Sequence, residues 1–137
     1  MRLVHYPAAG GTTTGTASDV DPETVREGDS QQSVLATTVD LADSLLSQIR
    51  GLMFRGSIPD DYALAFRFGT AKTRDVHMLF VFVPIDAVWV VDGGVQRVER
   101  LRPWRGFARE ECDLLVELPA GAADGVEPGD RLVLEEP

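Results

Sequence analysis

Short apolar runs separated by turn residues fill most of the chain beyond residue 60. Runs of four to eight residues that are rich in valine, leucine and aromatic side chains are typical of β-strands. The sequence Asp92-Gly93-Gly94 separates two of these runs and favours a tight hairpin, because glycine accepts a positive φ. The strands that this pattern predicts are residues 34–38, 62–68, 76–83, 85–91, 95–101, 113–118 and 131–135.

One segment has helical periodicity instead. Residues 41–53 place their large apolar side chains on one helical face, and Asp40 precedes them as an N-cap. Short antiparallel strands at such spacing favour a sandwich or a barrel. We therefore predict a mainly β fold, which is a jelly-roll-like sandwich or a partly closed barrel of short antiparallel strands with one helix near residues 41–53.

The N-terminal part of the chain lacks this pattern of apolar side chains. Between residues 8 and 33, Val20 and Val25 are the only large apolar side chains among glycine, threonine and acidic residues. Such a stretch buries too little apolar surface to offset the entropy lost on ordering. We predict that residues 1–33 are largely disordered, apart from a short strand within residues 1–6, and that residues 34–137 form a single β-rich domain.

The composition excludes several function classes. Cys112 is the only cysteine, and His5 and His77 are the only histidines, so neither a disulfide scaffold nor a cysteine- or histidine-rich metal site is expected. No cofactor is indicated. The longest apolar stretch is far shorter than the ~20 residues of a membrane span, and no secretory signal is recognisable. These features predict a cytoplasmic protein without a membrane anchor.

The balance of charge is unusual. The chain has 22 acidic residues against 13 basic ones, a net charge of −9, and Lys72 is its only lysine. A strongly acidic surface suits a protein that must stay hydrated in concentrated salt, where self-repulsion is screened. The composition therefore indicates a salt-adapted host and does not indicate an activity.

Four short motifs follow one another along the chain: Arg50-Gly51-Leu52-Met53-Phe54-Arg55, Ala63-Leu64-Ala65-Phe66-Arg67-Phe68, Pro84-Ile85-Asp86 and Leu115-Val116-Glu117-Leu118-Pro119-Ala120-Gly121. In this order and spacing they resemble the prokaryotic family catalogued as domain of unknown function number 192, over about residues 34–135. The resemblance implies a small jelly-roll-like domain with one helix near its start and no established activity. Many members have Trp-Met-Lys-Asn-Thr where this chain has residues 77–81, so no site residue is carried over there.

An enzymatic site has one candidate arrangement. Asp75 and His77 are two residues apart and lie on the same side of an extended chain, and Asp86 follows the next apolar run. A carboxylate that orients an imidazole can produce a general base, so Asp75, His77 and Asp86 are the candidate catalytic residues. The alternative is that His77 is a strand residue bonded to the backbone and that Asp75 lies in a turn.

Asp86 also has a structural interpretation. Alternation places it on the same face as Val88 and Val90, where a buried carboxylate must be paired. The candidate partners are Arg50, Arg67 and Arg74.

Residues 97–109 hold five arginines against one glutamate, a local charge of +4. With Trp104 among them, they are a candidate surface for a ligand or a protein partner. Concentrated salt disfavours nucleic acid, and the arginines can instead pair with nearby acids. The candidate residues of this surface are Arg97, Arg100, Arg102, Trp104 and Arg105.

The sequence leaves the function unknown and favours a β domain that binds a small ligand or a partner. Met53, Met78, Phe80 and Phe82 are candidates for the lining of a ligand pocket, or for core packing. The alternatives are an enzyme around Asp75, His77 and Asp86, and a binder of anions or single-stranded nucleic acid through Arg97–Arg109.

Overall fold

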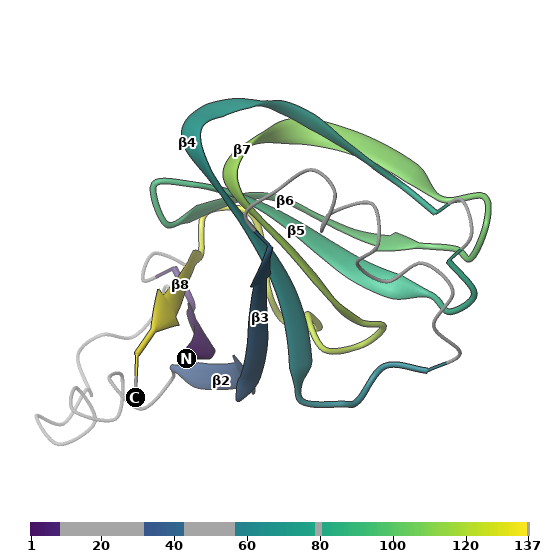
Figure 1. Ribbon diagram of the computed structural model, residues 1–137. Coiled ribbons are helices and arrows are strands. Elements are labelled where there is room, and N and C mark those ends of the chain that lie inside the picture. Colours follow the sequence, from purple (N-terminus) through teal and green to yellow (C-terminus); the bar gives the residue numbers. More distant parts are fainter. Residues whose placement is uncertain (9–31, 43–56, 79–80, 137) are drawn as a thin grey trace, which may run out of the picture.

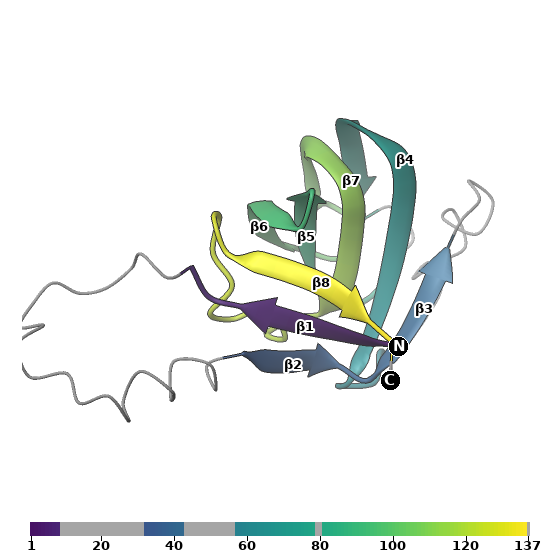
Figure 2. The same cartoon turned by 90° about the vertical axis from the view of Figure 1, so that its left-hand side faces the viewer.

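The computed structural model describes residues 1–8, 32–42, 57–78 and 81–136. Its strands form one open, mixed sheet in the order β2-β1-β8-β6-β5-β7-β4-β3. The sheet is strongly bent, and β1 and β8 run across the direction of β4 and β7 (Figures 1 and 2). The predicted mainly β fold is confirmed. The strands are β1 (Arg2–Tyr6), β2 (Ser33–Ala36), β3 (Thr38–Ala42), β4 (Tyr62–His77), β5 (Ile85–Val91), β6 (Gly94–Leu101), β7 (Phe107–Pro119) and β8 (Arg131–Glu135).

The central hairpin follows the sequence closely. Strands β5 and β6 pair in antiparallel fashion on either side of a two-residue turn, in which Asp92 has φ 49° and Gly93 has φ 81°. Positive φ at both central positions defines the turn that matches the twist of a hairpin, and Asp-Gly is a preferred sequence for it. The predicted hairpin is confirmed.

The helix prediction is wrong at its start. Asp40 and Leu41 lie in β3, which pairs in parallel with β4, and Asp40 is opposite Leu64. The Asp40 carboxylate accepts a hydrogen bond of 2.9 Å from the Tyr62 hydroxyl and does not cap a helix. Main-chain pairing with β4 therefore stabilises the extended form here. The remainder of the predicted helix, residues 43–53, lies outside the described residues. Within the described ranges, no helix is long and apolar enough to cross a membrane.

Strand β4 continues through the end of the predicted strand 62–68 and reaches the start of the predicted strand 76–83, ending at His77. It includes the polar stretch 69–75, where the sequence predicts no strand. The reason is that the outer half of β4 pairs with β7, from Lys72 opposite Cys112 to His77 opposite Phe107. The predicted strand 76–83 is wrong at Met78 and at residues 81–83, and residues 79–80 lie outside the described residues. The Met78 N–H still donates to the Gly106 carbonyl at 3.0 Å, in register with the ladder, but the Val81 N–H donates back to the Met78 carbonyl at 3.0 Å, so Val81 does not continue the strand.

Gly106 is required at this crossing of two segments. An added Cβ would lie 2.8 Å from the Arg102 backbone nitrogen, the Leu101 Cβ and the Met78 Cγ. We expect Gly106→Ala to lower the free energy of unfolding by about 2 kcal/mol, as overpacking commonly does. Gly69→Ala is the matched control, because no atom lies within 4 Å of the added Cβ and its φ is not positive. Chemical denaturation of both variants checks this, and equal stabilities would contradict it.

The N-terminal strand is confirmed. Strand β1 lies between β2 and β8, and Leu3 and Val4 are fully buried. Buried His5 contacts Asp130 through Nε2 and Oδ2 at 2.7 Å, which fastens β1 to the turn before β8. Residues 9–31 lie outside the described residues, so disorder there stays a prediction.

Each face of the central strands carries its own part of the core. Ile85, Ala87 and Trp89 of β5 contribute to one cluster, whereas Val88 and Val90 contribute to the other. This confirms the alternation expected along residues 85–91. Of the candidate pocket residues, Met78 is buried in the first cluster and Phe82 is exposed, and Met53 and Phe80 lie outside the described residues.

Candidate functional site

Asp86 is held by four hydrogen bonds. The carboxylate is 2% exposed and accepts from Arg100 Nε at 2.9 Å and from Arg100 Nη2 at 3.4 Å. It also accepts from the backbone N–H groups of Gly121 and Ala123 at 2.9 and 3.0 Å. A buried charge that is paired and fully hydrogen-bonded is one that a fold tolerates. The carboxylate thereby joins β5 to the loop that follows β7.

Among the described residues, the arginine that pairs with Asp86 is Arg100, which the sequence did not suggest. Arg67 lies elsewhere on β4, and Arg74 donates to the carbonyls of Cys112 and Thr70. Arg50 lies outside the described residues. Arg100 stands directly opposite Asp86 in the pairing of β5 with β6. Counting outward from the Asp-Gly turn would have paired Asp86 with Glu99, because an irregularity between Trp89 and Val90 shifts the register by one residue.

The three candidate catalytic residues sit in different surroundings. Asp75 and His77 are both exposed and flank buried Val76 on β4, as the two-residue spacing predicts. The Asp75 carboxylate binds Arg109 at 3.0 and 3.4 Å. Asp86 instead faces the second core cluster and binds Arg100. The structure therefore places the two acids in separate ion pairs, and the contacts described for them do not include His77.

The arginine-rich segment is partly neutralised by acids. Arg97 binds Glu99 at 3.4 Å, and Arg100 binds Asp124 at 2.7 Å as well as Asp86. Arg109 is held by Asp75. Within the described part of the chain Arg102 and Arg105 are exposed and form no ion pair, and Trp104 between them is exposed as well.

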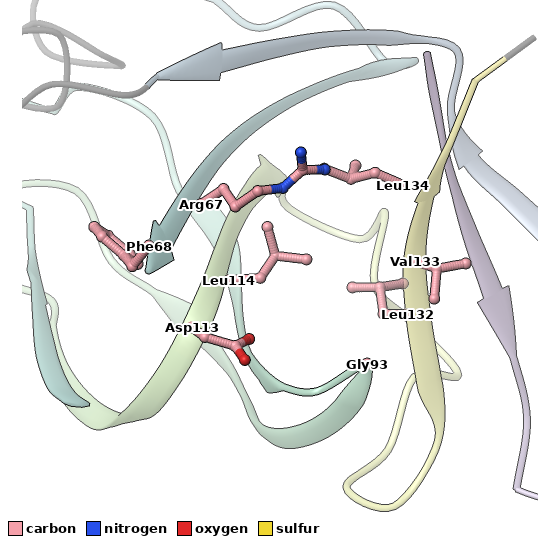
Figure 3. A pocket seen from close by; sticks show the side chains of 8 residues that line it. All are labelled: Arg67, Phe68, Gly93, Asp113, Leu114, Leu132, Val133 and Leu134. Atoms are coloured by element: carbon pink, nitrogen blue, oxygen red, sulfur yellow. The ribbon is translucent and has the colours of Figure 1, made fainter. Parts of the chain in front are cut away.

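A pocket of about 320 Å³ opens where the sheet separates (Figure 3). Among the described residues β6 pairs with β8 only at Gly94 opposite Arg131, so β8 diverges from the central strands beyond that point. Side chains of the described residues leave a gap between β8 and the β4–β7 pair. Its lining comes from β4, β7, β8 and the hairpin turn: Arg67, Phe68, Gly93, Asp113, Leu114, Leu132, Val133 and Leu134.

Two opposite charges flank the apolar floor of this pocket. Leu132 is fully buried, and Leu114 lies between Arg67 and Asp113 in Figure 3, where the Arg67 guanidinium extends toward Leu134. Asp113 Oδ2 accepts the Asp92 N–H at 3.1 Å, which fixes the carboxylate. Neither charge is paired with another described residue. The arrangement can hold an apolar body with polar groups at both ends.

Sequence reasoning missed this pocket. It considered Arg67 only as a partner for Asp86 and placed the other lining residues in ordinary strands. No local pattern marks the site, because it depends on where β8 leaves its neighbour.

Glu117 is a second acid that sequence reasoning did not single out. It stands on β7 directly opposite Leu64 on one side and Ala87 on the other, which are both members of the first core cluster. Burial raises the pKa of its carboxyl to about 7. The acid therefore sits on an apolar face without a cation opposite it in either ladder.

The chain is similar to proteins of uncharacterised function. The model of the DUF192 family, described as an uncharacterised ACR, matches residues 25–134. A UPF0127 protein of Thermococcus sibiricus is 30% identical over 100 residues, which are 69% of this chain and 64% of that relative. This chain thus spans less than two thirds of the relative's length.

Two solved structures share the fold. A protein from Sinorhizobium meliloti, described provisionally as a transcription regulator, matches with a TM-score of 0.68 at 24% identity over 96% of this chain and 92% of its own. A protein of unknown function from Novosphingobium aromaticivorans matches with a TM-score of 0.68 at 20% identity over 97% and 84%. At these identities the likeness concerns the fold alone.

Proposed function

Because the chain belongs to the DUF192 family, which has no established activity, we propose a function from the geometry of its pocket: it binds a small amphipathic molecule between β7 and β8. The observation that carries the proposal is the apolar floor flanked by Arg67 and Asp113. Sites for small ligands are mostly apolar hollows of about 300–1,000 Å³ in which a few polar groups fix orientation. The ligand has an apolar body, an anionic group for Arg67 and a hydrogen-bond donor for Asp113.

The two charged groups define the chemistry of the ligand. A guanidinium donates two parallel hydrogen bonds to a carboxylate or a phosphate. Asp113 keeps Oδ1 available, since its Oδ2 accepts the Asp92 N–H. An ammonium or hydroxyl group of the ligand fits that oxygen. A linear ω-amino acid carries these two groups at opposite ends of an apolar chain, which makes 6-aminohexanoate the first compound to test.

We expect 6-aminohexanoate to shift the backbone amide resonances of Leu114 and Leu132 in a titration followed by NMR. Hexylamine lacks the carboxylate, and hexanoate lacks the amine. Each should bind about tenfold or more weakly, since one hydrogen bond to a charged group contributes about 1.5–3 kcal/mol.

The Arg67→Gln variant should lose affinity for 6-aminohexanoate by about tenfold and should bind hexylamine as the parent does. The matched control is Arg105→Gln, which removes another exposed arginine that lies outside the pocket. Equal effects of the two substitutions, or no response to any of the three compounds, would refute the pocket as a ligand site.

We also propose that the protein works in a cytoplasmic, salt-rich setting. The support is the net charge of −9 with a single lysine. If self-repulsion opposes folding at low salt, the midpoint of thermal unfolding should rise by several degrees between about 0.1 M and about 2 M potassium chloride. Calorimetry at the two salt concentrations measures this. A flat or falling midpoint would count against the salt-adapted setting.

A further inference from the structure

The turn that joins β6 to β7 presents exposed aromatic and cationic side chains. Trp104 is 45% exposed and Phe107 is 57% exposed. The ring of exposed Phe82 lies 5.5 Å from that of Trp104, with a 52° angle between their planes. We call Phe82, Arg102, Trp104, Arg105 and Phe107 the aromatic turn surface.

Trp104 is held in a conformation that bulky residues rarely adopt. Its φ is 65°, and the Arg105 N–H donates to the Pro103 carbonyl at 2.7 Å. A hydrogen bond from residue i+2 to residue i around a central residue of positive φ is a γ-turn of the strained type. Glycine would meet this demand without a steric cost. A tryptophan at this position is therefore not explained by the needs of the turn.

The surroundings enforce this strain. The Trp104 N–H donates to the Val81 carbonyl at 3.1 Å, and the Gly106 N–H donates to the Arg102 carbonyl at 3.0 Å. The absence of a side chain at Gly106 lets the segment lie against Met78. Strained residues that a rigid framework keeps in place cluster at functional sites. The turn thus holds an exposed indole ring in a fixed position.

The charges around the ring select the kind of partner. Arg102 and Arg105 are exposed on either side of Trp104 and form no ion pair with a described residue. Arg97, Arg100 and Arg109 are neutralised by acids. Beside this ring, two arginines that form no ion pair with a described residue, on a chain of net charge −9, are too few to hold a polyanion, whose binding depends on many phosphate contacts.

We propose that the aromatic turn surface docks a protein segment that carries an apolar side chain flanked by carboxylates. Tryptophan and arginine are the residue types that dominate the binding energy of protein interfaces. Trp104 is the anchor, and Arg102 and Arg105 pair with the partner's carboxylates. This surface shares no residue with the pocket lining, so the two proposals stand or fall separately.

A display library of random linear peptides tests the proposal. Peptides are selected on the parent chain and then measured individually by fluorescence anisotropy. We expect the recovered sequences to combine an aliphatic or aromatic side chain with at least one aspartate or glutamate on each side. Trp104→Ala should weaken their binding by about thirtyfold or more, as for an interface hot spot. Arg102→Gln and Arg105→Gln should each weaken it several-fold.

Val34→Ala is the control, because Val34 is an exposed apolar side chain on β2 away from this turn, and it should leave peptide binding unchanged. Fully buried Trp89 remains in Trp104→Ala, and its fluorescence reports whether the variant is folded. Recovery of no peptide that depends on Trp104 overturns the proposal. So do recovered peptides without acidic residues, and so does tighter Trp104-dependent binding of a single-stranded thymidine oligonucleotide.

Trp104→Gly separates a binding role from a structural one. Glycine relieves the positive φ at the cost of the ring contact with Phe82, so the midpoint of thermal unfolding should stay within a few degrees of the parent value while peptide binding is lost. A fall of more than about 8 °C would mean that Trp104 serves stability, and it would overturn the proposal.

Discussion

Asp86→Ala should lower the free energy of unfolding by about 3 kcal/mol, because it removes a buried carboxylate that accepts four hydrogen bonds, two of them from backbone N–H groups. The change leaves the N–H groups of Gly121 and Ala123 without their acceptor, and Arg100 keeps only its exposed bond to Asp124. Urea denaturation of the parent and the variant at one salt concentration measures the loss.

Asp75→Ala is the matched control for this experiment. Asp75 binds Arg109 at 3.0 and 3.4 Å, close to the 2.9 and 3.4 Å of the Asp86–Arg100 pair, but both side chains of the Asp75–Arg109 pair are exposed. An exposed ion pair contributes about 0–1 kcal/mol, so this variant should unfold almost as the parent does. A loss below about 0.5 kcal/mol for Asp86→Ala would contradict the structural role and would return Asp86 to consideration as a functional acid.

Glu117→Gln should stabilise the fold at high pH. Burial raises the pKa of Glu117 to about 7 from its ordinary value of 4.5. The folded protein therefore retains a proton that the unfolded chain releases between these values, and stability falls as the pH rises from about 4.5 to about 7. Glutamine does not carry this penalty. At about pH 8 the variant should be more stable by about 2 kcal/mol, which is less than the full shift implies because the side chain keeps some contact with solvent.

The same comparison at about pH 4 is the internal control. Glu117 is then protonated in both the folded and the unfolded protein, so the parent and the variant should be almost equally stable. Other titrating groups affect both proteins alike and cancel in the difference. A stability difference that does not change with pH, or a parent that is the more stable at about pH 8, would mean that a cation pairs with the carboxylate.

Periodicity predicted the central strands because the burial of their residues follows the local pattern of apolar side chains. Every residue of β5 except Asp86 and Val91 belongs to one of the two apolar clusters, and the Asp-Gly turn joins the strand to β6. The outer half of β4 was missed for the opposite reason. Residues 69–75 are mostly exposed, and they form a strand only because β7 pairs with them. Their sequence therefore has no alternation of apolar and polar side chains from which the pairing could be predicted.

The candidate sites show the same contrast between features that local sequence predicts and features that depend on strand pairing. The need of Asp86 for a partner was predictable from its valine neighbours, but the choice of Arg100 required strand register. The predicted start of the helix was wrong because Asp40 and Leu41 pair in parallel with β4. A local capping pattern carries no information about such a distant strand. The pocket beside Arg67 required knowledge of where β8 leaves β6. Long-range strand pairing thus determined the features of the sites that local sequence patterns did not predict.

The position of β1 in the sheet has a consequence for biosynthesis. Its residues pair with β8, from Arg2 opposite Glu135 to Tyr6 opposite Arg131, so β1 cannot complete its pairing until β8 has been synthesised. Pairings between such distant residues are slow to form, since a long loop must close before they form. The hairpin of β5 and β6 can form while the chain is still being made. Until β8 is available, the side chains of Leu3 and Val4, which the folded sheet buries fully, lack part of their cover and are a site where unfinished chains can associate.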